Sequence, residues 1–283
     1  MSPPSYSDLG KNSRDVFSKG YLSGLFKLDC KTATESGVKF SFGGNMSSEG
    51  SKVSGNLEMK HTMKDCGLTF TEKWSTDNTL HATVDATDKV LQGLKLTLDS
   101  SYSPLNNEKK SKLKATLKQE KFTLTGDAGL LPAVSPLINA SIVLGHQNWL
   151  GGAQIAFDSS KSKLTKNAFA LDYCAKDFVL HTNINDGNVF GASLYQRVNP
   201  IMEAGVNVGY TSSSNASTFG VGLKYKLDQG SSVSAKVNNS GIVGLGFSHK
   251  LKDGIILNLS TLLNGKNLNE GGNKLSLGLE LEA

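Results

Sequence analysis

The stretch Leu25-Phe26-Lys27-Leu28-Asp29-Cys30-Lys31 alternates between apolar and polar side chains. Phe26, Leu28 and Cys30 share one face, whereas the three charged residues share the other. A period of two is typical of a β-strand that has one face in apolar and one in polar surroundings. The stretch therefore predicts a strand, and the same pattern recurs along the chain.

Many later runs repeat this alternation, with Ser, Thr, Asn, Gly or charged residues between the apolar positions. Their apolar faces include Val38/Phe40/Phe42, Val53/Leu57/Met59, Leu94/Leu96/Leu98, Leu113/Ala115/Leu117, Ile138/Ala140/Ile142/Leu144, Met202/Ala204/Val206/Val208, Phe219/Val221/Leu223/Tyr225, Val233/Ala235/Val237 and Leu275/Leu277/Leu279/Leu281. Turn clusters of hairpin length, such as Asp186-Gly187-Asn188, separate the runs. The pattern predicts about nineteen strands that pair antiparallel as a meander.

The number of strands predicts a closed barrel in a membrane. Twisted sheets of more than about ten strands tend to curl, split or close, and side chains cannot fill so wide a barrel. The apolar faces must then point outward into lipid while the polar faces line water. The alternative is a soluble β-sandwich or a carbohydrate-binding domain, whose apolar faces would meet in a core. Solubility without detergent would favour that alternative.

Composition is consistent with one barrel domain. The 283 residues are only 38% hydrophobic, and no apolar run could form a membrane-spanning helix. No secretory signal is recognisable, and three cysteines leave at least one thiol free, which together favour a reducing, intracellular setting. We expect an N-terminal helix and glycine hinge in residues 1–24 and a barrel in residues 25–283.

The N-terminal segment is the only part with helical periodicity. Apolar or small residues recur with a spacing of three and four at Tyr6, Leu9, Gly10, Ser13, Val16 and Phe17. This spacing predicts a helix over 6–19, started by a capping box of Ser5 and Asp8 and ended by Gly20 and Gly24. Taken alone, the pattern fits a surface helix.

The barrel changes that interpretation, because an apolar helix face needs a wall to cover it. Leu9, Val16 and Phe17 should rest on the inner wall. The charged side chains of Lys11, Arg14 and Lys19 should face the pore.

Basic residues dominate the predicted water-facing sides of the strands. The net charge is +5, and the candidate pore-lining bases are Lys95, Lys112, Lys114, Lys118 and Lys236. A positive lumen favours anions, but only weakly, because salt screens exposed charges over about 8 to 10 Å.

Several motifs resemble those of the eukaryotic mitochondrial porins, the voltage-dependent anion channels of the mitochondrial outer membrane. They are Tyr6-Ser7-Asp8-Leu9-Gly10-Lys11, Gly67-Leu68-Thr69-Phe70-Thr71-Glu72-Lys73-Trp74, Gly93-Leu94-Lys95-Leu96, Ser234-Ala235-Lys236-Val237-Asn238-Asn239-Ser240 and Leu263-Asn264-Gly265-Lys266-Asn267. Nineteen strands are an established feature of that family, so the agreement with the count above is not an independent determination. An odd number requires the first and last strands to pair parallel.

The resemblance implies a function as a channel. Chloride, phosphate, ATP/ADP and other small metabolites would pass, and the pore would close with voltage through the N-terminal helix inside the lumen. No cofactor is expected, and ATP and NAD would be ligands or permeating solutes. No specific nucleic acid is expected as a partner.

The resemblance also suggests residues that contact nucleotides. They are Lys11, Lys19, Ile242, Val243, Gly244, Ser260, Thr261, Leu262, Leu263 and Asn264. The residues themselves favour another interpretation for Gly241-x-x-Gly244-x-Gly246, which opens no helix: glycine there eases the curvature of the strand.

Glu72 is a carboxylate on an apolar strand face. It alternates with Leu68, Phe70 and Trp74, so we expect it to face lipid, where a charged group is costly. The alternative is a β-bulge that turns Glu72 into the lumen. In the resembling family the matching acid is linked to hexokinase docking and calcium sensitivity. A second hypothesis is therefore a docking scaffold with reduced conduction that binds hexokinase-type partners, apoptosis regulators or further copies of the chain.

Catalysis has little support in the sequence. The five histidines lie in separate runs or turns, and none has a metal-ligand neighbour at the usual spacing. No nucleophile motif is recognisable. We expect neither an enzyme nor a metal site.

Overall fold

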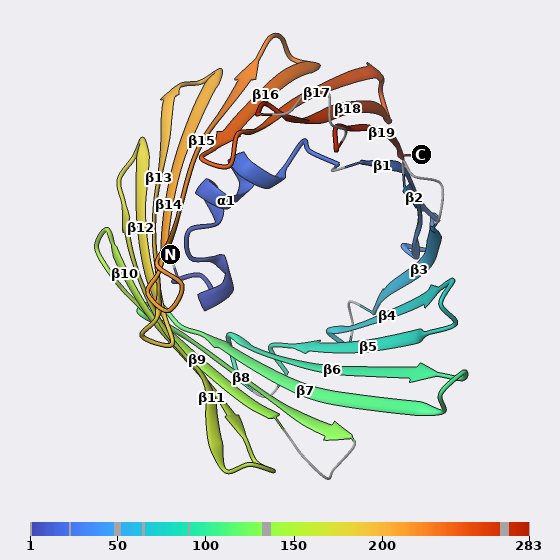
Figure 1. Ribbon diagram of the computed structural model, residues 1–283. Coiled ribbons are helices and arrows are strands. Elements are labelled where there is room, and N and C mark those ends of the chain that lie inside the picture. Colours follow the sequence, from blue (N-terminus) through green and yellow to red (C-terminus); the bar gives the residue numbers. More distant parts are fainter. Residues whose placement is uncertain are drawn as a thin grey trace.

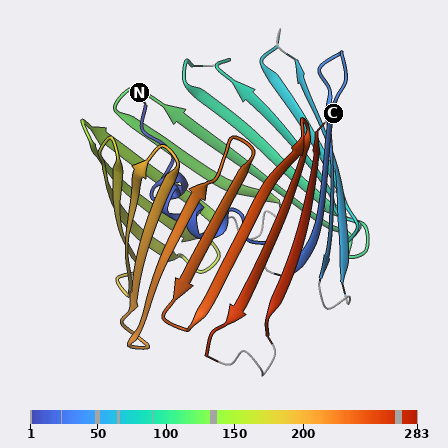
Figure 2. The ribbon, with the colours of Figure 1, turned by 90° about the horizontal axis from the view of Figure 1, so that it is seen from above.

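A computed structural model describes residues 2–22, 24–47, 52–63, 66–89, 91–131, 137–266 and 272–282. These residues form a closed barrel of nineteen strands with the N-terminal segment inside it (Figures 1 and 2). The strands are β1 (Leu25–Ala33), β2 (Lys39–Ser47), β3 (Val53–Met63), β4 (Leu68–Ser75), β5 (Leu80–Thr87), β6 (Leu94–Ser103), β7 (Glu108–Lys118), β8 (Phe122–Leu131), β9 (Leu137–His146), β10 (Trp149–Asp158), β11 (Lys163–Cys174), β12 (Phe178–Asn185), β13 (Val189–Asn199), β14 (Met202–Thr211), β15 (Ala216–Lys226), β16 (Ser231–Asn238), β17 (Ile242–Lys252), β18 (Ile255–Asn264) and β19 (Lys274–Glu282).

The barrel closes through its two terminal strands. Consecutive strands pair antiparallel from β1 to β19, and β1 then pairs with β19 in parallel, with Leu28 opposite Leu279. Antiparallel pairing reverses direction at every step, so an odd number of strands leaves the first and last pointing the same way. The predicted fold and its parallel seam are confirmed.

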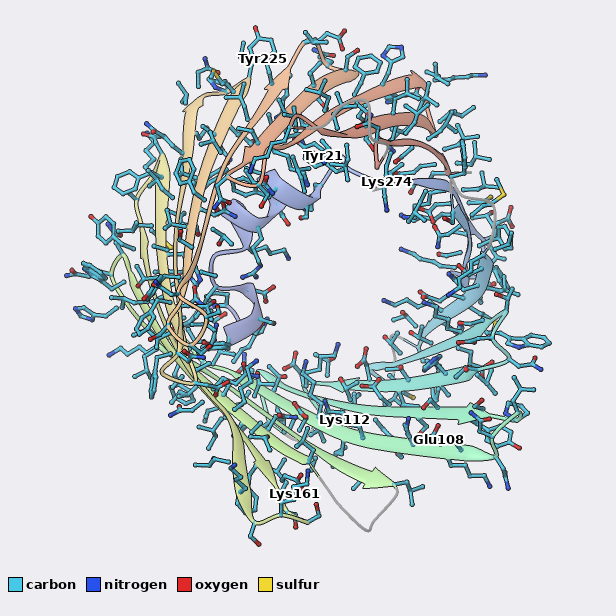
Figure 3. All side chains as sticks on the ribbon, viewed as in Figure 1. Tyr21, Glu108, Lys112, Lys161, Tyr225 and Lys274 are labelled. Atoms are coloured by element: carbon cyan, nitrogen blue, oxygen red, sulfur yellow. The ribbon has the colours of Figure 1, made fainter. Side chains whose placement is uncertain are left out.

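The strand faces follow the alternation of the sequence. Cα partners across a ladder share a face, and Phe26 lies opposite Met46 on β2 and Leu277 on β19. All three side chains are exposed on the outside of the barrel. In Figure 3, Tyr225 points away from the barrel, whereas Lys274 points into the lumen. An apolar outer surface around a polar interior is the arrangement that lipid requires.

Where the connections between strands are fully described, turn residues of the sequence lie in the turns. Asp186 and Gly187, between β12 and β13, have φ angles of 51° and 65°. Two consecutive residues with positive φ are typical of the tight hairpin turns whose twist matches that of the strands.

The N-terminal segment contains two short helices instead of the single one predicted over 6–19. A 3₁₀ helix, η1 (Tyr6–Asp8), is followed by α1 (Lys11–Ser18), and Gly10 between them has a φ of 65°. This left-handed conformation interrupts the helical hydrogen bonding. None of the described helices is long and apolar enough to cross a bilayer.

The predicted capping box, in which Ser5 and Asp8 would bind backbone N–H groups, does not form. The Ser5 hydroxyl donates to a carboxylate oxygen of Asp8 at 2.5 Å, and neither helix has a side-chain cap on its backbone N–H groups. The two side chains therefore satisfy each other instead of the backbone.

Candidate functional site

The N-terminal segment lies along the inner wall, with α1 against β13, β14 and β15 and η1 against β9 and β10 (Figure 1). Leu9 is only 1% exposed and packs with Val143 and Ala170 of the wall. Val16 is buried as well, at 3% exposure. The helix face that the sequence marks as apolar therefore contacts the wall.

Glycines of the wall make room for this contact. A Cβ atom at Gly152 would lie 2.6 Å from Leu9 Cδ1, and one at Gly222 would lie 2.9 Å from Val16 Cγ1. A Cβ atom at Gly246 would lie 2.5 Å from the carbonyl oxygen of Gly20. At Gly246 the missing side chain has a use that the sequence did not predict: it lets the backbone of the segment approach the wall.

Wall side chains also bind the backbone of the segment at points distributed around the barrel. Thr123 Oγ1 donates to Pro3 O at 2.6 Å, Ser260 Oγ accepts from Leu22 N at 2.9 Å, Ser276 Oγ accepts from Gly24 N at 2.6 Å, and Asp172 Oδ2 accepts from Gly10 N at 2.9 Å. These bonds satisfy backbone groups that the irregular parts of the segment leave without helical partners.

Lys236 binds the C-terminal end of α1. Its Nζ donates to Phe17 O at 2.6 Å and lies 4.0 Å from the centre of the Tyr21 ring. An ammonium group is favoured at the negative end of a helix and over an aromatic face. Lys236 therefore lies on the inner face, as predicted, but it is turned to the segment and not to the open pore.

The other predicted pore-lining bases lie on the inner faces of β6 and β7. Lys95 pairs with Asp85 at 3.1 Å, and Lys112 pairs with Asp127 at 2.7 Å. Lys114 and Lys118 alternate with outward-facing residues of β7 and share the face of Lys112. Because carboxylates offset part of this positive charge, any preference for anions should be modest.

Lys11 and Lys19 stand at opposite ends of α1, about 12 Å apart along its axis. Lys11 pairs with Asp8 at 3.6 Å, and Lys19 pairs with Asp15 at 2.6 Å, while both lysine side chains stay more than half exposed in the lumen. The hydrogen bond from Ser5, followed by the nearby Lys11, lowers the pKa of the Asp8 carboxyl. Arg14 Nη1 donates to Leu9 O at 2.6 Å, so its guanidinium fastens the turn between η1 and α1.

The nucleotide-contacting residues suggested on β17 and β18 do not form one surface. Val243, Thr261 and Leu263 belong to the outward-facing side of the two strands by their register, whereas Ile242, Gly244, Ser260, Leu262 and Asn264 belong to the inner side. Ser260 is 4% exposed and already bonded to Leu22 N. A single ligand therefore cannot contact the whole set.

Glu72 faces outward. It lies opposite Met59 on β3 and Ala82 on β5, and neither ladder shows a register shift at this position. The side chain is exposed next to the 60% exposed Trp74. The alternative of a bulge that turns Glu72 into the lumen is therefore excluded.

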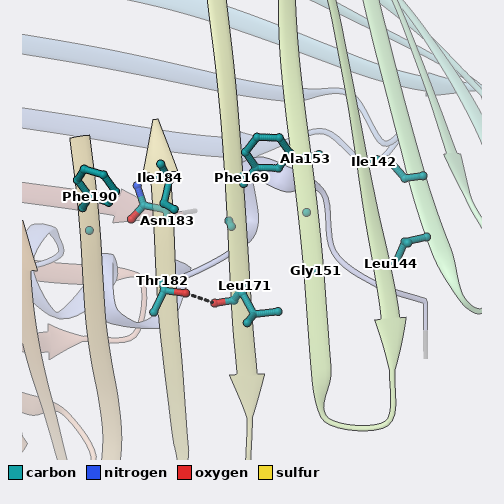
Figure 4. Close-up of a pocket in the computed structure, with 13 residues that line it drawn as sticks. Ile142, Leu144, Gly151, Ala153, Phe169, Leu171, Thr182, Asn183, Ile184 and Phe190 are labelled. Atoms are coloured by element: carbon teal, nitrogen blue, oxygen red, sulfur yellow. Dashed lines mark hydrogen bonds between the residues drawn. The ribbon is translucent and has the colours of Figure 1, made fainter. Parts of the chain in front are cut away.

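A hollow of about 670 Å³ lies on the outer surface across β9 to β13 (Figure 4). It forms where Gly151 and Ala153 present little side chain between the larger Leu144 and Phe169. The hydroxyl of Thr182 donates to Leu171 O at 3.3 Å, so this polar group is satisfied within the outer face. The hollow is apolar and suits a lipid chain.

The sequence did not single out Asp172, Thr123 or Ser276, although each binds the segment. One signal was available: the inner face of β11 carries Ala168 and Ala170 where polar residues are expected. Both alanines are buried, at 0% and 8% exposure, and Ala170 packs against Leu9 of the segment.

The chain matches the model of the eukaryotic porin family over residues 2–275. It is 52% identical over 283 residues to a voltage-dependent anion-selective channel of Drosophila melanogaster, with 100% of both chains covered. It is 50% identical over 281 residues to the non-selective voltage-gated ion channel VDAC2 of Xenopus laevis, with 99% of both chains covered. The corresponding VDAC1 of Rattus norvegicus is 48% identical, again with 99% of both chains covered.

Solved structures show similarity at the level of the fold. A mutant of the Rh. blastica porin superposes with a TM-score of 0.52 at 10% sequence identity, over 81% of this chain and 96% of that chain. A second mutant of the same porin gives a TM-score of 0.51 at 11% identity, over 80% of this chain and 95% of that chain. At such low identity the likeness concerns the barrel architecture alone.

Proposed function

Because this chain belongs to the eukaryotic porin family, we propose that it is a voltage-gated, weakly anion-selective pore of the mitochondrial outer membrane. Family membership makes it a pore-forming integral membrane protein and not an enzyme. Chloride, phosphate, ATP/ADP and other small metabolites are the proposed solutes. We propose that residues 25–283 form the pore and that residues 1–24 form the gate.

One observation carries this proposal: an apolar outer surface encloses a polar lumen in which a charged segment lies against the wall. The inner faces of β6 and β7 carry Lys95, Lys112, Lys114 and Lys118, and Lys11 and Lys19 remain exposed on the segment. A displacement of the segment would narrow the pore and move positive charge within it. This supports a link between voltage, closure and selectivity.

Reconstitution of the full chain into a planar bilayer tests the pore. We expect a large conductance that falls when the voltage increases and a reversal potential that favours chloride in a KCl gradient. Because the Debye length shrinks from about 10 Å at 0.1 M to about 3 Å at 1 M salt, the preference for chloride should weaken as salt increases. The absence of any current through correctly folded protein, or a reversal potential that favours potassium, would contradict the proposal.

ATP and NAD are proposed as permeating solutes or weak ligands of the lumen and not as cofactors. The exposed ammonium groups of Lys11 and Lys19 support contact with phosphate groups during passage. Of the residues suggested on β17 and β18, only those on the inner face can take part in such contacts.

A second candidate function is a docking scaffold, supported by the outward position of Glu72. Hexokinase-type kinases, apoptosis regulators and further copies of this chain are the proposed partners. We expect Glu72→Gln to leave the conductance unchanged and to weaken the binding of hexokinase to liposomes that contain the protein. The reason is that an outward side chain lies far from the permeating ions but is available to a partner in the membrane.

Glu58 offers the matched control. It lies on the neighbouring strand β3, opposite Lys73 on the inner face. Glu58→Gln makes the same change in charge on the other side of the wall, so kinase binding should stay intact. Equal kinase binding by the wild type and both variants would show that Glu72 is not part of the docking surface.

A further inference from the structure

The break at Gly10 coincides with a buried acid and an imidazole of the wall. We propose that Asp172 and His181 form an anchor that holds Gly10 in its docked position, and that this anchor sets the voltage at which the pore closes. The inference rests on the proposed role of the N-terminal segment in closure. It concerns two residues that position the gate and do not contact the permeating ions.

The hydrogen bonds of Asp172 support this role. The residue is 3% exposed; one carboxylate oxygen accepts from Gly10 N at 2.9 Å, and the other lies 2.5 Å from Nδ1 of His181. Both oxygens therefore have a partner, one from the segment and one from the neighbouring strand β12. Departure of the segment would break the bond from Gly10 N and open this oxygen to the lumen, so the docked position keeps one hydrogen bond to a charged group that the undocked position loses.

The shape of the contact makes it specific for glycine. A Cβ atom at position 10 would lie 2.6 Å from Cγ and Cδ2 of His181, and the φ of 65° is one that glycine adopts without strain. The imidazole therefore lies directly against the backbone of the segment. His181 thus has two roles, because it supports the carboxylate and also forms the surface on which Gly10 rests.

The surroundings connect the anchor to the rest of the gate. Leu9, next to Gly10, is buried against Ala170, which lies two residues before Asp172 on the same strand face. Burial and then the negative charge of Asp172 raise the pKa of the Tyr6 hydroxyl. Arg14, Lys166 and His181 border one cleft of about 490 Å³ between the segment and the wall. Movement of the segment would therefore open this cleft beside the anchor.

The anchor differs from the other attachments of the segment. Among the wall side chains described above as bonded to its backbone, Thr123, Ser260 and Ser276 are neutral, whereas Asp172 is an acid and Lys236 a base. Hydrogen bonds to charged groups are the stronger ones. Asp172 binds the segment at Gly10, just before α1 begins. The hydrogen bond between Gly24 N and Ser276 lies after α1 and can persist when the bond to Asp172 breaks.

Asp172→Ala, with His181→Phe as a second variant that keeps the ring, tests the anchor in planar bilayers. We expect each variant to keep the full open conductance and to shift the equilibrium toward the closed state about tenfold at a fixed voltage. Amide hydrogen exchange of Gly10, measured by NMR in nanodiscs, should accelerate at least tenfold. The double variant should add little to either single change, because both remove one shared interaction.

Asp99→Ala is the matched control. Asp99 also lies on the inner face and accepts a hydrogen bond from Thr83 at 2.8 Å, but on β6, across the lumen from α1 (Figure 1). This variant should close at the wild-type voltage and leave Gly10 exchange unchanged. If Asp172→Ala behaves like Asp99→Ala in either measurement, the anchor as proposed is wrong.

A deletion of residues 1–19 separates this result from the proposed gating. If the deletion removes voltage closure while Asp172→Ala changes neither the closing equilibrium nor Gly10 exchange, the result would support the gating role of the segment and contradict the anchor. If the truncated pore still closes at the wild-type voltage, the segment is not the gate. Asp172 and His181 then do not control closure either. In that case Gly10 exchange reports only on the docking of the segment.

Discussion

A pore without residues 1–19 is expected to conduct more current than the full chain and to remain open at voltages that close the full chain. The deletion leaves all nineteen described strands intact, including the β1 to β19 seam, so the barrel can still form. It removes α1 and its charges from the lumen, which widens the path and takes away the proposed moving part. Single-channel recordings in planar bilayers measure both effects.

A double variant with Lys11 and Lys19 changed to Gln is the control for this deletion. It keeps the apolar face, the bulk of the segment and the bond from Arg14 to Leu9 O while removing two positive charges. The open conductance should then remain that of the full chain, while the preference for anions and the steepness of the voltage response should fall. A truncated pore that closes at the wild-type voltage would show that the gate lies elsewhere.

Leu9→Ala is expected to release the segment from the wall about a hundredfold more often than in the wild type. Leu9 is 1% exposed between the segment and Val143, and truncation of a fully buried leucine costs about 3 kcal/mol. Each 1.4 kcal/mol corresponds to about a factor of ten in an equilibrium. Because the lost contact lies between the segment and the wall, the cost should fall on docking and not on barrel stability.

The rate at which a buried thiol is modified measures this release. Ser13 is 3% exposed, and its hydroxyl has no hydrogen-bond partner among the described residues, so Ser13→Cys is a mild change. With the three native cysteines changed to Ser, a small thiol reagent should label Cys at this position about a hundredfold faster when Leu9→Ala is added. Leu28→Ala, on the outer face at 39% exposure, should leave the labelling rate unchanged. Equal rates for both variants would contradict the proposed docking by Leu9.

Local patterns in the sequence were sufficient to predict the barrel. Strict alternation in runs such as 94–98 and 275–281 specifies both the strands and their faces, because a strand has a period of two. The odd number of strands then requires the parallel seam. The outward position of Glu72 follows from the same alternation, because no bulge interrupts β4.

The course of the N-terminal segment depends on partners that local patterns do not contain. Gly10 fits the helical spacing, yet it adopts a left-handed conformation and donates to Asp172, 162 positions away. The spacing predicts an apolar face but not the kink within it. Similarly, the run from Ser260 to Asn264 alternates between the two sides of the wall, so residues that are adjacent in sequence do not share a ligand.

The parallel seam also bears on how such a chain can be assembled. Phe26 pairs with Leu277, so the ladder that completes the ring joins the first of the nineteen described strands to the last. Until β19 is available, β1 remains an unpaired edge that can capture a strand of another chain. Contacts between such distant residues form late and slowly. The barrel therefore cannot close before β19 has been synthesised, and a cell would need to shield the open intermediate until then.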